Sequence, residues 1–190
     1  MPVKWRVVLL FFQVAVLIVV TKFVTGHFLI NEVWFISGLV LAFLITACLS
    51  DETWKKNERK QISDFLKTVP DSVISLKPSG LYYIELKAGV GRSPVVSDIA
   101  YFKYIGRFLN GIAFDSVSTV SAPYAYLMGS FTIVAGVDEG LRYMKAGGKA
   151  LLLTPSDIAY GSQGIFNVIP GYTPLLWEIE LDSVKAGNGR

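Results

Sequence analysis

Cysteine and histidine are almost absent from this sequence. The 190 residues contain one cysteine, Cys48, and one histidine, His27. A single cysteine cannot form an internal disulfide bond, so no disulfide framework supports the fold and cysteine usage does not identify a redox compartment. Structural zinc sites and histidine-activated nucleophiles draw on several such side chains. We therefore expect no metal site and no cofactor, and several classes of enzyme are excluded.

Basic runs are also missing. The formal net charge is +3, and no basic run or basic face stands out after residue 50. A nucleic-acid-binding protein usually carries a basic stripe or patch, so we expect no nucleic-acid partner. The apolar share, 52%, is high, and its excess lies in residues 7–20 (VVLLFFQVAVLIVV) and 33–49 (VWFISGLVLAFLITACL).

These two apolar runs indicate attachment to a membrane. The first falls short of the roughly 20 residues that span a bilayer, and the second reaches the lower edge of that range. The second run ends in LITACLSDE, which resembles the lipobox of bacterial lipoproteins with Cys48 as the lipidated residue. The acidic residues that follow resemble a retention pattern of Bacteroidetes-like bacteria. The alternative is that Cys48 lies inside a transmembrane helix.

A charged segment separates the apolar leader from the rest. Residues 51–69 (DETWKKNERKQISDFLKTV) predict a helix that ends before Pro70. Its apolar side chains form one stripe: Trp54, Ile62, Phe65, Leu66 and Val69. We interpret the helix as a solvated spacer that lays a few apolar residues against the next domain, and a dimerisation helix is the alternative. The predicted boundaries are 1–48 for the leader or anchor, 49–77 for the linker, 78–185 for the domain and 186–190 for a flexible tail.

The domain pattern is mostly strand. Residues 80–89 (GLYYIELKAG) and 173–184 (TPLLWEIELDSV) have strand character, and the second alternates apolar and acidic residues as a half-buried antiparallel strand does. Asn110-Gly111 predicts a two-residue hairpin turn. One helix is expected in GVDEGLRYMKAGG. The predicted class is α+β, an antiparallel sheet wrapped on one short helix and preceded by an apolar membrane-targeting segment.

The helix has recognisable ends in the sequence. Asp138 and Glu139 lie in its predicted first turn, where acidic side chains suit the helix dipole. Gly147 and Gly148 are expected to close it. Glu139 and Arg142 are interpreted as its solvated face.

Three segments in this order resemble the FKBP-type peptidyl-prolyl cis-trans isomerases: FKYIGRFLNGIAFDSV, then FTIVAGVDEGLRYMKAGGKALLLTPSDIAYG, then VIPGYTPLLWEIELDSV. The shared features are a tyrosine soon followed by glycine, Phe-Asp after the hairpin, an apolar pair before an acidic-Gly-Leu helix, the Ala-Tyr-Gly loop and the Ile-Pro turn. The resemblance covers roughly residues 78–184. It implies proline-containing polypeptides as partners and macrolides as further ligands.

The resemblance also implies the site. Asp115 would contact the ligand, and Tyr160, expected to be exposed in its turn, would donate a hydrogen bond to the substrate. Val134 would offer its backbone N–H to the substrate carbonyl. The remaining positions would wall or cover the pocket: Tyr104, Phe114, Tyr124, Ile133, Val137, Val168, Ile169 and Trp177. Without the resemblance, aromatic residues on strands are usually core, and Asp115 could be a turn residue.

One position departs from the family pattern. Val137 stands where the family has the tryptophan that floors the proline pocket, and Trp177 stands where phenylalanine is usual. The leading hypothesis is a membrane-anchored prolyl isomerase of the bacterial cell envelope that assists folding of exported proteins. The alternative is a non-catalytic binding or chaperone module of an envelope assembly, which Val137 favours.

Overall fold

The computed structural model describes residues 51–70, 74–117 and 123–187. Within that part of the chain, no helix combines the length and the apolar character needed to cross a membrane. The apolar runs at 7–20 and 33–49, and with them Cys48, lie outside the described residues. Lipidation and membrane attachment therefore stay predictions.

The described residues from Trp54 onward belong to one compact unit. Its strands, in chain order, are β1 (Ile74–Leu76), β2 (Tyr82–Lys87), β3 (Ile99–Phe108), β4 (Ala113–Val117), β5 (Tyr124–Leu127), β6 (Lys149–Thr154) and β7 (Leu175–Lys185). Two helices accompany them, residues 51–66 and α3 (Ala135–Tyr143), with a short 3₁₀ helix η2 (Ser156–Ile158).

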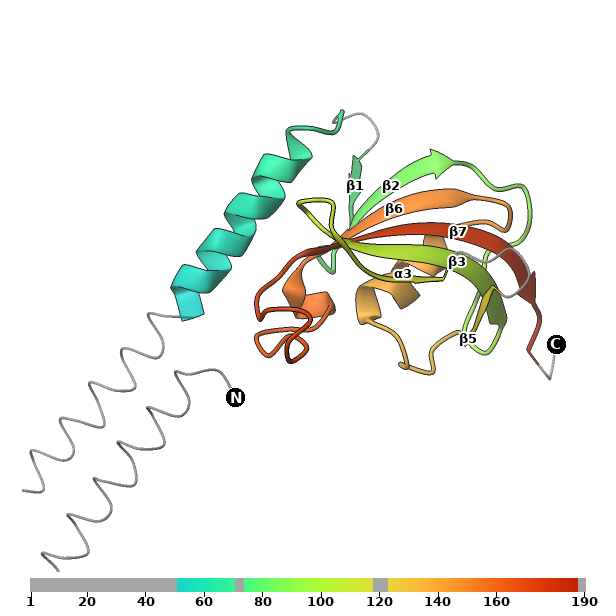
Figure 1. Ribbon diagram of the computed structural model, residues 1–190. Helices are drawn as coiled ribbons and strands as arrows, with labels where there is room; N and C mark the ends of the chain where they lie inside the picture. The colour runs from blue at the N-terminus through green and yellow to red at the C-terminus, as the bar shows by residue number, and fades with distance from the viewer. Residues whose placement is uncertain (1–50, 71–73, 118–122, 188–190) are drawn as a thin grey trace, which may run out of the picture. The chain divides into compact units, whose positions relative to one another are not determined.

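The strands form one antiparallel sheet in the order β1-β2-β6-β7-β3-β4, and β5 also pairs with β3 (Figure 1). The long strand β3 therefore carries β7 on one side and both β4 and β5 on the other. The predicted antiparallel sheet with a short helix on it is confirmed. The sequence pattern did not indicate β1.

Apolar and charged residues alternate along β7, and this alternation shows which face of the sheet is buried. Trp177, Ile179 and Leu181 are buried, as predicted. Between them, Glu178 forms an ion pair with Lys149 on the opposite face, with 2.5 Å between Oε1 and Nζ. Because successive side chains of a strand point to opposite faces, one face joins the core and the other carries charges.

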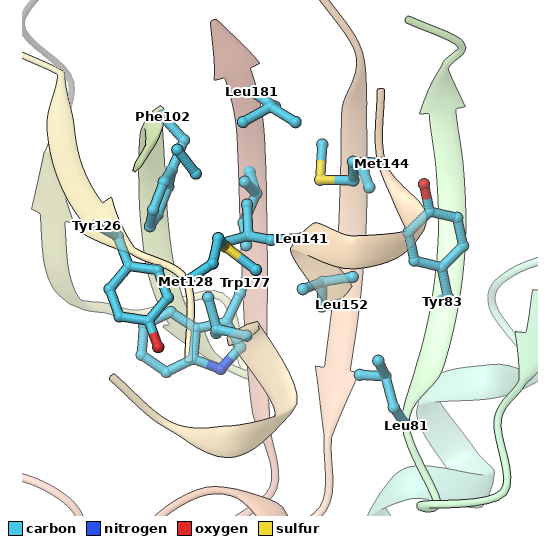
Figure 2. Close-up of a cluster of buried hydrophobic side chains, with 14 of the residues drawn as sticks. Leu81, Tyr83, Phe102, Tyr126, Met128, Leu141, Met144, Leu152, Trp177 and Leu181 are labelled. Carbon is cyan, nitrogen blue, oxygen red and sulfur yellow. The ribbon is translucent and has the colours of Figure 1, made fainter. Parts of the chain in front are cut away.

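The core lies between α3 and the inner face of the sheet. Figure 2 shows Leu141 and Met144 of the α3 region facing Leu152 and Leu181 of the central strands. All four are almost fully buried. Burial of such side chains contributes roughly 1.5–3 kcal/mol each, so this layer is the main source of stability for the sheet and α3.

The hairpin between β3 and β4 differs from the expected two-residue turn. The Phe108 N–H donates to the Ile112 carbonyl, and the Gly111 N–H donates to the Phe108 carbonyl. Three residues, 109–111, therefore form the loop. Only Gly111 has a positive φ, 89°, and Asn110 does not. A three-residue loop needs just one left-handed position, which glycine fills, whereas the two-residue type I′ turn needs two.

Helix α3 is shorter than predicted. It ends at Tyr143, because Met144 is extended, with φ −80° and ψ 157°. Gly147 and Gly148 do not close it. They lie in a following turn in which the Gly148 N–H donates to the Lys145 carbonyl.

The charged residues of α3 were also misassigned. Asp138 lies in the first turn, but Glu139 does not. Arg142 is not merely solvated, because its Nη2 lies 2.5 Å from Oδ2 of the buried Asp138. Asp138 and Arg142 are therefore partners in a partly buried polar network on α3.

The predicted charged helix is confirmed over residues 51–66. Its stripe is only partly buried: Ile62 has 6% of its surface exposed, whereas Trp54 has 47%. Val69 lies beyond the helix end. Glu58, which the solvated-spacer interpretation leaves in water, is in fact buried.

Candidate functional site

A cluster of aromatic rings covers the inner face of the sheet where β3, β4, β5 and β7 meet. The rings of Phe114 and Trp177 meet edge to face at 5.3 Å between centroids, and Tyr104 lies 6.0 Å from Trp177. Tyr104 and Tyr124 meet edge to face at 6.2 Å. The structure thus brings together the four aromatic residues that the sequence analysis assigned to the pocket wall.

Two further rings belong to this cluster but were not predicted. Phe102 lies 5.6 Å from Tyr124, and Phe108 lies 5.3 Å from Phe114, between ring centroids. Both lie on β3 at even spacing from Tyr104. The period of two along a strand was therefore a signal that could have found them.

Gly106 makes room for the rings. It pairs with Trp177 across β3 and β7. A Cβ atom at this position would lie 2.7 Å from Cζ of Phe114 and 3.0 Å from the indole of Trp177. Real Cβ contacts are longer, so any larger residue would displace the two rings. Glycine is thus required at position 106 because there is no space for a side chain.

The indole of Trp177 is held in one orientation. Its Nε1–H donates to the Thr154 hydroxyl oxygen at 3.0 Å, and that hydroxyl donates to the Leu175 carbonyl at 3.2 Å. Both bonds are buried. A buried indole N–H needs such an acceptor. Thr154 was not predicted as a site residue, and nothing in its local sequence indicated this contact.

One polar pair lies among the aromatic walls. The Tyr104 hydroxyl donates to Oδ2 of Asp115 at 2.7 Å. Burial raises the pKa of the Tyr104 phenol well above its usual value, and the bond to Asp115 raises it further. The phenol therefore stays protonated and remains a donor throughout the physiological pH range. Asp115 lies within β4 rather than in a turn, and it accepts this hydrogen bond.

Tyr160 follows the 3₁₀ helix η2, and its environment differs from the expectation. Its side chain is partly buried and packs against the core, where an exposed ring was predicted. Burial raises the pKa of its hydroxyl, and the negative charge of Asp115 adds to the effect. A neutral phenol there can donate a hydrogen bond.

The start of α3 contributes backbone groups and a floor. Val134 precedes the helix in an extended conformation, and Ile133 and Val134 both pack against the core. Among the described residues, no acceptor takes a hydrogen bond from the Val134 N–H. Val137 is buried, with 4% of its surface exposed. A free N–H beside an apolar floor suits a carbonyl group of an extended peptide.

The two predicted flap residues behave differently. Ile169 is buried, and it exchanges two backbone hydrogen bonds with Ile165, at 2.8 and 2.9 Å. Val168 is half exposed at the turn between them, beside Phe166, which has 73% of its surface exposed. The turn thus exposes the apolar side chains of Phe166 and Val168, and the two Ile165–Ile169 hydrogen bonds close it.

The arrangement suits non-covalent chemistry. Within residues 51–70, 74–117 and 123–187, no group of three histidine, cysteine, aspartate or glutamate side chains could hold a metal ion. The site contains an aromatic surface and the Tyr104 hydroxyl, which donates a hydrogen bond to Asp115. It also contains the Tyr160 hydroxyl and the backbone N–H of Val134. Such groups can orient a peptide and change the electrostatic environment of one of its bonds.

Comparison with known proteins fits this description. The family model "FKBP-type peptidyl-prolyl cis-trans isomerase" matches residues 91–182. The chain is 36% identical over 102 residues to an FK506-binding protein of Neisseria meningitidis serogroup B, and the match covers 54% of the chain and 94% of that relative. The chain belongs to the FKBP-type peptidyl-prolyl cis-trans isomerase family.

Two further similar proteins match over more of this chain. The macrophage infectivity potentiator of Trypanosoma cruzi is 33% identical over 146 residues, covering 74% of this chain and 73% of the relative. The crystal structure of FkpA from Escherichia coli matches with a TM-score of 0.63 at 25% identity, covering 92% of this chain and 82% of that one. The match covers only 32% of the length of FK506-binding protein 4 of Dictyostelium discoideum. It covers 47% of the length of the FKBP-type peptidyl-prolyl cis-trans isomerase FkpA of Escherichia coli. The family assignment from the three motif segments is confirmed, whereas the roles of individual site residues stay predictions.

Proposed function

We propose that this protein is a peptidyl-prolyl cis-trans isomerase that rotates X-Pro bonds without covalent chemistry. The observation that carries the proposal is the aromatic surface of Tyr104, Phe114, Tyr124 and Trp177 with the Tyr104–Asp115 hydrogen bond at its edge. Membership of the FKBP-type family supports it.

The reaction needs an environment more than a reactive group. The barrier to rotation is about 18–20 kcal/mol, because resonance gives the C–N bond partial double-bond character. An apolar surrounding disfavours the charge-separated resonance form and weakens that character. A site that fits the twisted bond better than either planar isomer lowers the barrier further. Removing about 6 kcal/mol corresponds to more than four decades in rate.

Each polar group then has a defined role in the proposal. The Val134 N–H and the Tyr160 hydroxyl would hold carbonyl oxygens of the substrate on either side of the proline. Asp115, fixed by the Tyr104 hydroxyl at 2.7 Å, would face the rotating carbonyl group. Ile169 would close the apolar surface over the proline ring, with Val168 at the outer edge.

The test is a cis-to-trans assay on a series of proline tetrapeptides with a fragment of residues 51–190. We expect turnover that falls in the Asp115→Ala and Tyr160→Phe variants, because each removes one polar contact while leaving the aromatic walls. A folded fragment without turnover would refute the isomerase proposal.

A second candidate function rests on Val137. The family pattern has tryptophan at this floor position, so a binding or chaperone module that keeps the fold without useful turnover is the alternative. Val137→Trp separates the two. A weakened isomerase should gain activity, whereas a binding module should gain none. Val137 is buried, so a larger side chain would cost about 1–3 kcal/mol and stability must be measured in parallel.

Macrolide binding follows from the same pocket. One relative is named an FK506-binding protein, and we propose that this chain also takes macrolide ligands, though more weakly because valine offers less contact area than the usual indole. Titration of FK506 against the Trp177 fluorescence would measure this. Affinity unchanged by Val137→Trp would contradict the role given to the floor.

We further propose that the protein works at the bacterial cell envelope, held there by its apolar leader or by lipid on Cys48. The apolar runs at 7–20 and 33–49 and the LITACLSDE segment support this location. A protein there would assist exported chains whose X-Pro bonds isomerise in tens of seconds or longer. Mass analysis of the native amino terminus would decide it. An unmodified Cys48 in a chain that washes off membranes would overturn the proposal.

A further inference from the structure

A buried carboxylate joins the helix at residues 51–66 to the loop that carries Tyr160. Glu58 has 6% of its surface exposed. Its Oε1 accepts a hydrogen bond from the Ser156 backbone N–H at 2.5 Å, and its Oε2 accepts one from the Ser156 hydroxyl at 2.9 Å. A carboxylate with two such donors is a strong contact, since hydrogen bonds to charged groups exceed neutral ones.

Ser156 in turn shapes the backbone on both sides of Tyr160. Its carbonyl accepts hydrogen bonds from the Ala159 N–H at 2.9 Å and from the Gly161 N–H at 2.8 Å. Ser156 also begins the 3₁₀ helix η2, whose first N–H groups have no partner inside the helix. Glu58 supplies the missing acceptor, so a shift of Ser156 would move both residues that flank Tyr160.

Two other described features of this helix are weaker or less direct. Lys55 and Asp157 form an ion pair at 3.4 Å, with 36% and 69% of their side-chain surfaces exposed. Exposed pairs of this kind contribute little. Ile62 is buried and packs the helix against the unit, but it makes no polar contact with the loop. Glu58 therefore makes a buried, two-donor polar contact between the helix and the loop, which the Lys55–Asp157 pair does not match.

We propose that Glu58 is a positioning residue for Tyr160, so that the helix before the sheet completes the candidate site. The catalytic part of this inference rests on the proposed function, in which the Tyr160 hydroxyl holds the substrate. The structural part stands apart from it. Without the carboxylate, the buried Ser156 N–H loses its acceptor and the turn through residues 156–161 loosens.

The first experiment measures the turn itself, in the full chain kept in mild detergent. Hydrogen-exchange mass spectrometry would follow a peptide spanning residues 156–161. We expect Glu58→Ala to speed exchange there by at least about tenfold, as loss of a hydrogen bond to a charged group implies. Exchange in β6 should not change. Gln61→Ala is the matched control, because Gln61 is an exposed residue on the same helix.

The second experiment measures kcat and KM for a proline tetrapeptide in a double-mutant cycle. We expect Glu58→Ala to lower kcat/KM in the parent chain. In a Tyr160→Phe background the same change should cost no more than about twofold, because the hydroxyl that Glu58 positions is already gone. Glu58→Gln keeps one carbonyl oxygen for the Ser156 N–H and should recover part of the activity. A general loss of stability would instead lower activity equally in both backgrounds.

The outcomes separate this inference from the proposed function. If the parent chain has no isomerase activity, the proposed function fails and the exchange experiment alone decides the role of Glu58. Unchanged exchange at residues 156–161, or an equal loss of activity with and without the Tyr160 hydroxyl, would overturn the inference. If Glu58→Ala does not fold, Ser156→Ala removes only the hydroxyl contact and must still speed exchange in the turn.

Discussion

Asp138 offers the sharpest test of how this fold is held together. Its Oδ1 accepts hydrogen bonds from the Tyr126 hydroxyl at 2.8 Å and the Gly129 N–H at 2.9 Å. Its Oδ2 accepts from Nε and Nη2 of Arg142 at 3.0 and 2.5 Å. One buried carboxylate thus ties α3 to β5 and to the loop after it. The perturbation is Asp138→Ala, which removes all four acceptor contacts at once.

The expected cost follows from what the substitution leaves behind. The Tyr126 hydroxyl is buried with its ring, which has 1% of its surface exposed, and it would lose its acceptor. Arg142 is half buried and would lose its counter-charge. Leaving the buried Tyr126 hydroxyl without its acceptor costs about 1–3 kcal/mol, and the loss at Arg142 adds less because its side chain, 35% exposed, can be hydrated instead. Asp138→Asn keeps one carbonyl oxygen for Tyr126 and Gly129 but faces Arg142 with an amide, so we expect an intermediate loss.

Urea unfolding of residues 51–190, followed by circular dichroism, measures these free energies. Glu139→Ala is the matched control, because Glu139 neighbours Asp138 and accepts only an exposed hydrogen bond from Tyr143 at 3.0 Å. We expect the control to lie within about 0.5 kcal/mol of the parent, as surface substitutions usually do. If Asp138→Ala costs no more than Glu139→Ala, the claim that this carboxylate joins α3 to β5 is refuted.

Three further predictions concern the site and the response to pH. Gly106→Ala places a Cβ 2.7 Å from Cζ of Phe114, so we expect a changed near-ultraviolet circular dichroism spectrum and a larger loss of isomerase activity than of stability; an unchanged spectrum with full activity would contradict the packing argument. The pKa of Asp98 is lowered by the Val95 and Gly187 N–H groups and by Arg92, so its stabilising contribution is complete above the ordinary aspartate pKa and is lost as the pH falls through the lowered value. Asp98→Asn should therefore destabilise the protein at neutral pH and flatten its acid unfolding curve, and parallel curves would count against this. Burial raises the pKa of Tyr104, as it does for several other tyrosines, so the part of an ultraviolet titration at the highest pH should lose the absorbance change of one tyrosine in Tyr104→Phe; an unchanged high-pH amplitude in that variant would exclude the assignment.

Much of the fold could be predicted because its signals are local. The alternation of β7 predicts which face is buried, since a strand repeats every two residues. The Phe-Asp, Ala-Tyr-Gly and apolar-pair motifs predict a family, and the structure brings Phe114 of the first motif into contact with Phe108 and Trp177. The strand spacing could also have located Phe102 and Phe108.

The remaining features depend on tertiary structure, which local patterns do not report. Glu58 looks like any charged residue of an exposed helix, because its partner Ser156 lies 98 positions away. Asp138 has the position of a dipole-stabilising residue, yet its burial comes from Tyr126 and the loop after β5. The end of α3 was placed too late because two glycines are a common stop signal, whereas the extended backbone of Met144 ends the helix earlier.

The length of the edge strands has a consequence for the proposed function. Strand β1 at one edge has three residues, and β4 and β5, which share the opposite side of β3, have five and four. An exposed edge strand is a template on which another chain can add a strand, and short edge strands are one way proteins avoid this. In the part of the chain described by the structure, the longest strands, β3 and β7, are interior. Under the proposed function, a client polypeptide would therefore find aromatic side chains to bind but little free backbone to pair with, which would favour its release over co-aggregation.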